Sequence, residues 1–76
     1  MRSAKTTRIY ETSDVIRMPE PIEELGIEAG RVGVVDCVYD EGRMLLVEVP
    51  RPDGTTIGFV DIRTEPEPHV VGYSAM

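Results

Sequence analysis

A chain of 76 residues holds one small domain, and its fourteen acidic and eight basic residues give a formal net charge of −6 at pH 7. A domain of this length buries only about 60% of the surface that its unfolded chain exposes, so its margin of stability is thin. One cysteine, Cys37, excludes an intrachain disulfide, and Cys37 with the only histidine, His69, cannot supply the four ligands of a structural zinc ion.

The acidic charge argues against a nucleic-acid partner, because a phosphate backbone is bound by clustered basic residues. The arginines are scattered along the sequence, and only the first eight residues have a small basic bias. A plain solubility effect explains the acidity as well as a protein partner does. The absence of Asn and Gln fits a thermophilic source or a GC-rich genome equally well, and neither bears on activity.

The sequence predicts a flexible N-terminal arm over residues 1–13 and a single β domain over residues 14–76. Its first strand is expected over residues 14–18, where two prolines, Pro19 and Pro21, end it. The next residues, 21–25, are too few for a helix and predict one 3₁₀ turn that Gly26 terminates.

The longest apolar strand is predicted over residues 32–39, after a turn built on three glycines. Apolar side chains fall on both faces of this strand, which predicts either a β-bulge that shifts the alternation or a strand covered on both sides. A strand over residues 44–49 follows, and its alternation places Leu45, Val47 and Val49 on the core face.

Two hairpin turns are predicted, at residues 40–43 and 50–55, with glycines suited to left-handed positions. Further strands are expected over residues 56–60, where Ile57 and Phe59 point together, and over residues 69–71. Five short strands without a long helix predict an all-β fold, a small five-stranded antiparallel barrel whose closure removes exposed sheet edges.

The order of these motifs resembles a short bacterial family without an assigned function. The resemblance covers residues 14–71 and rests on D-V-I-R at 14–17, G-I-x-A-G-x-x-G-x-V at 26–35, L-V-E-V at 46–49 and D-G-T-T at 53–56. The chain is similar also to KOW-type and other Src-homology-3-like barrels. The resemblance implies a Src-homology-3-like fold and carries over no functional residue; Val34 and Cys37 depart from the family pattern.

No enzymatic constellation is present in the sequence, so we predict a protein that is not an enzyme and needs no cofactor or metal. His69 is interpreted as a surface histidine on an edge strand, and Cys37 as a small apolar filler within a strand. The glycine-rich turn lacks the spacing and the Lys-Ser/Thr of a phosphate-binding loop.

We hypothesise a non-catalytic protein-interaction module that binds another protein or itself. Its expected interface is the acidic and apolar loop after the first strand, with Ile22 and Leu25 as the apolar centre of a surface formed by Ile22, Glu23, Glu24, Leu25 and Glu28. One alternative is a KOW-like nucleic-acid module that uses Arg17, Arg31, Arg43 and the basic N-terminal arm. The other is an antitoxin or immunity partner. The unpaired cysteine and the lack of a long apolar run predict a cytoplasmic protein that is not in a membrane.

Overall fold

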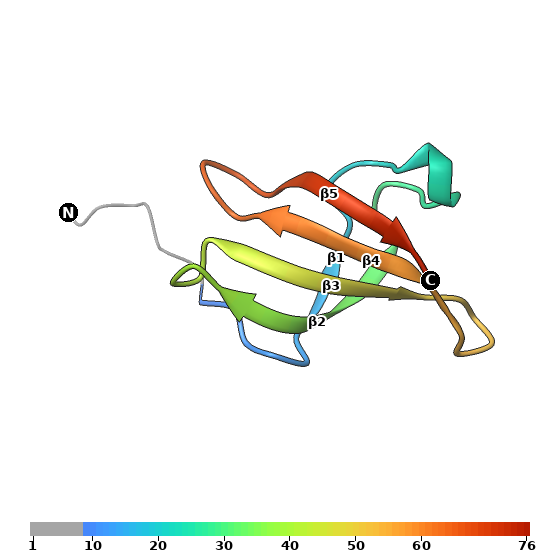
Figure 1. Ribbon diagram of the computed structural model, residues 1–76, viewed down its shortest axis with the longest axis horizontal. Helices are drawn as coiled ribbons and strands as arrows, with labels where there is room; N and C mark the ends of the chain where they lie inside the picture. Colours follow the sequence, from blue (N-terminus) through green and yellow to red (C-terminus); the bar gives the residue numbers. More distant parts are fainter. Residues whose placement is uncertain (1–8) are drawn as a thin grey trace.

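The computed structural model describes residues 9–76 as an all-β domain of five antiparallel strands, which confirms the predicted fold class (Figure 1). One 3₁₀ turn, η1, follows the first strand. In chain order the elements are β1 (Val15–Arg17), η1 (Glu23–Leu25), β2 (Val32–Tyr39), β3 (Met44–Pro50), β4 (Thr56–Arg63) and β5 (His69–Ala75). The last two strands are longer than the sequence predicts.

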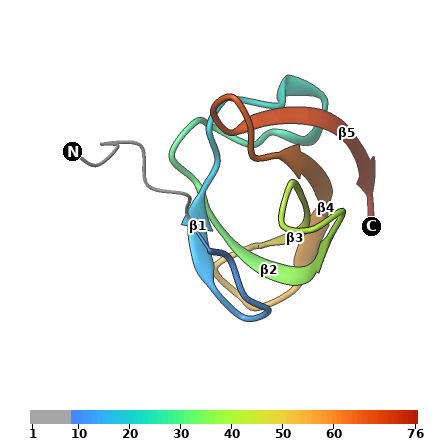
Figure 2. The same cartoon turned by 90° about the vertical axis from the view of Figure 1, so that its left-hand side faces the viewer.

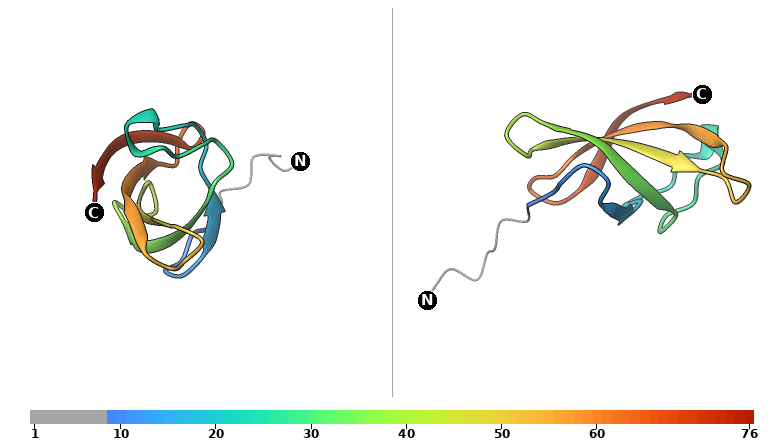
Figure 3. Two further views of the ribbon diagram at one scale, coloured as in Figure 1. Left: turned by 90° about the vertical axis from the view of Figure 1, so that its right-hand side faces the viewer. Right: turned by 90° about the horizontal axis from the view of Figure 1, so that it is seen from below.

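The sheet is open, whereas a closed barrel was predicted. Its strands pair in the order β1-β2-β3-β4-β5, and within residues 9–76 no ladder joins the edge strands β1 and β5. The sheet nevertheless curls strongly, so that the two edges approach each other (Figure 2). Closure fails because β1 has only three residues, with Pro19 soon after it, and because the segment that follows lies beside β5 (Figure 3). There the backbone N–H of Val70 donates to Glu20 Oε2 at 2.8 Å.

The core lies on the concave face of the curled sheet and combines aliphatic side chains from three strands with three from the loop after β1. The predicted core face of β3 is confirmed, because its three alternate residues are almost completely buried. The core consists of Met18, Ile22, Ile27, Val35, Leu45, Val47, Val49, Val60 and Ile62.

A bulge in β2 explains its apolar residues on both faces, and confirms the first of the two predicted alternatives. The pairing with β3 shifts between Val35 and Cys37. Val35 is fully buried before the shift, and Val38 packs against the core after it. Cys37 therefore lies on the outer face and is exposed, which corrects its interpretation as an apolar filler.

Glycines take the left-handed positions in the turns, as predicted. Gly42 and Gly54 adopt φ values of 88° and 93° in the two hairpins, and Gly26 ends η1 at φ 68°. Of the predicted arm, residues 1–8 lie outside the described residues, and Ser13 donates its N–H to Val35 O at 2.7 Å. Among residues 9–76, no helix has the length and apolar character that crossing a membrane requires.

Candidate functional site

The predicted interface on the loop after β1 does not present its apolar residues as a surface. Ile22 is 3% exposed and belongs to the core, while Leu25 is partly buried and packs against it. The loop folds back on itself through two backbone hydrogen bonds between Ile22 and Ile27, of 2.9 and 3.1 Å. Two glutamates of η1, Glu23 and Glu24, remain exposed, as does Glu28. The loop thus contributes an acidic rim, and its apolar side chains serve stability.

Of the three arginines of the nucleic-acid alternative, Arg43 lies apart from the other two. Arg43 forms ion pairs with Asp40 at 3.4 Å and Glu41 at 3.2 Å in its own hairpin. Arg17 donates to the carbonyl of Gly30, and Arg31 donates to a carbonyl of β3. Arg17 and Arg31 line one hollow, which Arg43 does not line.

An apolar groove of about 1040 Å³ lies between β1 and the loop that joins β4 to β5. One wall is β1 with the residues on either side of it, and the opposite wall is the loop between β4 and β5. Its apolar lining comes from Ile9, Tyr10, Val15, Ile16, Pro19, Val32, Val38, Leu45, Ile62, Pro66 and Pro68. Two of these side chains are largely uncovered, since Ile9 is 80% and Val15 66% exposed.

The first wall of the groove is a sheet edge with outward-facing backbone groups. On its inner side β1 is bonded to β2, where Val35 N–H donates to Asp14 O, and Met18 N–H donates to the carbonyl that precedes β2. Because an antiparallel strand directs successive backbone groups to alternate sides, the N–H and C=O groups of Val15 and Arg17 point away from β2. This edge therefore offers hydrogen-bonding positions to an added strand.

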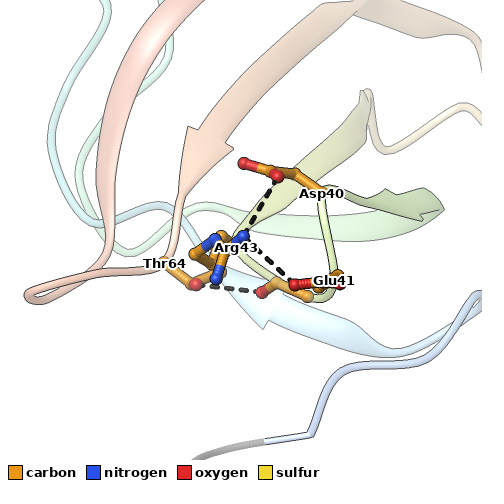
Figure 4. Close-up of polar contacts among 5 residues, drawn as sticks. Asp40, Glu41, Arg43 and Thr64 are labelled. Atoms are coloured by element: carbon orange, nitrogen blue, oxygen red, sulfur yellow. Dashed lines mark hydrogen bonds and ion pairs between the residues drawn. The ribbon is translucent and has the colours of Figure 1, made fainter.

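The second wall is held by the hairpin between β2 and β3 (Figure 4). Thr64 donates its backbone N–H to Arg43 O at 2.9 Å and its hydroxyl to Gly42 O at 3.0 Å. The ion pairs of Arg43 hold the same hairpin, and the pKa of Arg43 is raised by Asp40 first and then by Glu41 and Glu65. These contacts join the hairpin to the start of the proline-containing loop and fix the position of this wall of the groove.

The groove has opposite charges at its two ends. Glu41 and Glu65 line it beside the hairpin, and Arg17 lines it at the other end of β1. Ligand pockets are mostly apolar and have a few polar or charged groups that fix the orientation of the ligand, and the lining of this groove follows that pattern.

Within the described part of the chain, no three His, Cys, Asp or Glu side chains are placed to hold a metal ion. The Nδ1 atom of His69 contacts Glu67 O at 2.8 Å on the surface. On the outer face, burial raises the pKa of Asp36, and a hydrogen bond and charge repulsion from Glu48 raise it further. This carboxylate pair lies on two strands, so the sequence alone gave no signal of it.

Comparison with protein-family models, with curated proteins and with solved structures found no match for this chain. The resemblance to a bacterial family stays a prediction.

Proposed function

We propose that this protein is a non-catalytic interaction module that binds an extended segment of a partner protein in the groove beside β1. The observation that supports it best is an apolar groove that runs along β1, which among the described strands is paired on one side only. Strand addition to an exposed edge is a common mode of peptide recognition, in which backbone hydrogen bonds give affinity and side-chain pockets give specificity.

The groove favours an extended peptide over a compact ligand. The outward N–H and C=O groups of Val15 and Arg17 match the backbone of a strand laid next to β1. Alternate side chains of that strand would enter the apolar floor, as in any half-buried strand. The exposed surface of Val15 and Ile9 is then covered by the ligand.

The charges that line the groove indicate which charged residues the bound segment should carry. The end of the groove beside the hairpin carries Glu41 and Glu65, so a lysine or arginine of the segment is expected there. The net charge of −6 favours a cationic partner at long range and disfavours a second copy of the same chain.

The finer fold and location are part of this proposal. We propose that the curled sheet is a variant of the Src-homology-3-like barrel, which the consecutive antiparallel order and the 3₁₀ turn support. The protein is proposed to act in the cytoplasm, where an exposed free cysteine stays reduced.

The test is selection of random short peptides from a display library against the full chain. We expect enrichment of segments with alternating apolar residues and a basic residue at one end. Val15→Asp places a charge in the groove and should weaken the selected peptides about tenfold or more, which is the loss of one interface hot spot. The matched control is Val71→Asp, because Val71 is 50% exposed on β5 and does not line the groove.

Two results would overturn the proposal. The first is a selection without enrichment, or peptides that bind the Val15→Asp protein as tightly as the unchanged chain. The second is a dimer, detected by sedimentation, that Val15→Asp converts to monomer, because the groove would then hold a second copy. Reversal of the preferred charge by the double substitution of Glu41 and Glu65 to lysine would support the predicted orientation.

A further inference from the structure

A second hollow, of about 510 Å³, lies at the other end of β1 from the hairpin, and three arginines line it. They come from β1, from the residue before β2 and from the turn after β3. The lining consists of Arg17, the segment Glu28–Val32 and the segment Pro50–Pro52. Three of the five arginines in residues 9–76 therefore lie together on a protein that is acidic as a whole. The lining contains one negatively charged side chain, that of Glu28.

The guanidinium groups are oriented by backbone carbonyls of neighbouring segments. Arg17 Nη1 donates to Gly30 O at 3.0 Å, and Arg31 Nη2 donates to Pro50 O at 3.3 Å. Arg51 Nη1 donates to Thr56 O at 3.1 Å and to the hydroxyl of Thr55 at 3.2 Å. A guanidinium has five N–H donors, so each of these leaves further donors for a ligand.

We infer that this hollow binds a single oxyanion, either a carboxylate or a phosphate group. Planar guanidinium groups held in place recognise both through paired N–H donors, and charge-assisted hydrogen bonds are stronger than neutral ones. Arg17 lines both the groove and the hollow, but Arg31 and Arg51 line only the hollow, so substitutions at these two arginines test anion binding separately from peptide binding.

The surroundings favour a discrete anion over a nucleic acid. A phosphate backbone is met by a basic stripe, whereas here carboxylates flank the arginines. Glu28 lines the hollow, and Asp53 lies close enough to Arg51 for their attraction to help lower the pKa of Asp53, after the larger effect of Thr55. These carboxylates repel a polyanion such as a nucleic acid.

The experiment is a titration of the full chain with inorganic phosphate and, separately, with acetate, followed by amide chemical shifts at constant ionic strength. We expect saturable shifts confined to the amides of Arg17, residues 28–32, Arg51, Asp53 and Gly54. Arg31→Gln and Arg51→Gln should each weaken binding by about two- to fivefold, the range measured for exposed ion pairs. The matched control, Arg63→Gln, removes an exposed arginine of β4 that lines neither hollow and should leave the titration unchanged.

The two anions distinguish the sources, because a carboxylate site saturates with acetate and a phosphate site prefers phosphate. Arg31→Lys keeps the charge but loses the paired donors, so it should give an intermediate affinity in a folded protein. The inference fails if the shifts do not saturate, or if Arg63→Gln weakens them as much as Arg31→Gln. It also fails if a single-stranded oligonucleotide binds with a steep salt dependence, which would indicate a surface for several phosphates.

Discussion

Replacement of Gly58 by alanine should destabilise the protein strongly. Gly58 is a buried residue of β4, paired with Val49 on one side and Ala75 on the other. An added Cβ would overlap the carbonyl oxygen of Ser74 and approach Ala75 Cα and Leu25 Cδ1, both at 3.3 Å. The first two are backbone atoms of β5, so relief of the overlap requires β4 and β5 to separate.

Overpacking of this kind costs about 1–3 kcal/mol. Because a core of this size rarely supplies more than about 3–5 kcal/mol, the loss is a large share of the total. With a urea dependence of about 1 kcal/mol per molar, the unfolding midpoint should fall by about 1–3 M. Urea unfolding followed by circular dichroism measures this shift directly.

Gly72→Ala is the matched control, because the same atom added to β5 meets only Asp61 Oδ2, at 3.4 Å. Its free energy of unfolding should stay within about 0.5 kcal/mol of that of the unchanged protein, the usual range for surface substitutions, so its urea midpoint should shift by no more than about 0.5 M. Equal midpoints for Gly58→Ala and Gly72→Ala would refute the packing of η1 and β5 against β4.

Two further predictions concern the outer face of the sheet and the contact between β5 and the segment that follows β1. Burial and, after it, the 3.1 Å hydrogen bond to Asp61 raise the pKa of Tyr39. Asp61→Asn should therefore lower the pKa of Tyr39. Phenolate absorbance measures this pKa, and the Tyr39→Phe protein gives the reference signal of the other tyrosines. The folded state retains this proton, so the contribution of Tyr39 to stability is complete below the ordinary tyrosine pKa of about 10 and is lost as pH rises through the folded pKa. Glu20→Ala should accelerate hydrogen exchange at the Val70 amide, whereas Glu20→Gln keeps an acceptor and should change it little. Unchanged exchange in Glu20→Ala would contradict that bond.

Local patterns predict the strands well where one face alone is apolar. In β3 the alternation of Leu45, Val47 and Val49 identifies the core face, and the structure buries all three. In β2 both faces are apolar, and the bulge after Val35 decides which residues turn inward. Its position depends on pairing with β3, so Cys37 could not be placed outside from the sequence of β2 alone.

The burial of Ile22 could not be predicted for a similar reason. Its acidic neighbours suggested that Ile22 lies at the centre of a surface patch. The backbone hydrogen bonds between Ile22 and Ile27 instead direct its side chain toward the core. The groove was missed because its lining comes from segments as far apart as Ile9 and Pro68. Only the curl of the sheet brings them together, and no local pattern encodes that curl.

The short length of β1 links both proposed sites. A longer strand could pair with β5 and close the seam, whereas three residues leave the outer side of Val15 and Arg17 uncovered. Arg17 lines both hollows, and Glu41 and Glu65 line only the far end of the groove. A segment along β1 that is basic at one end and acidic at the other would therefore satisfy both sites in one direction only. If the segment were reversed, like charges would meet at both ends. The resulting repulsion selects one direction of the bound segment, which backbone hydrogen bonds alone do not select.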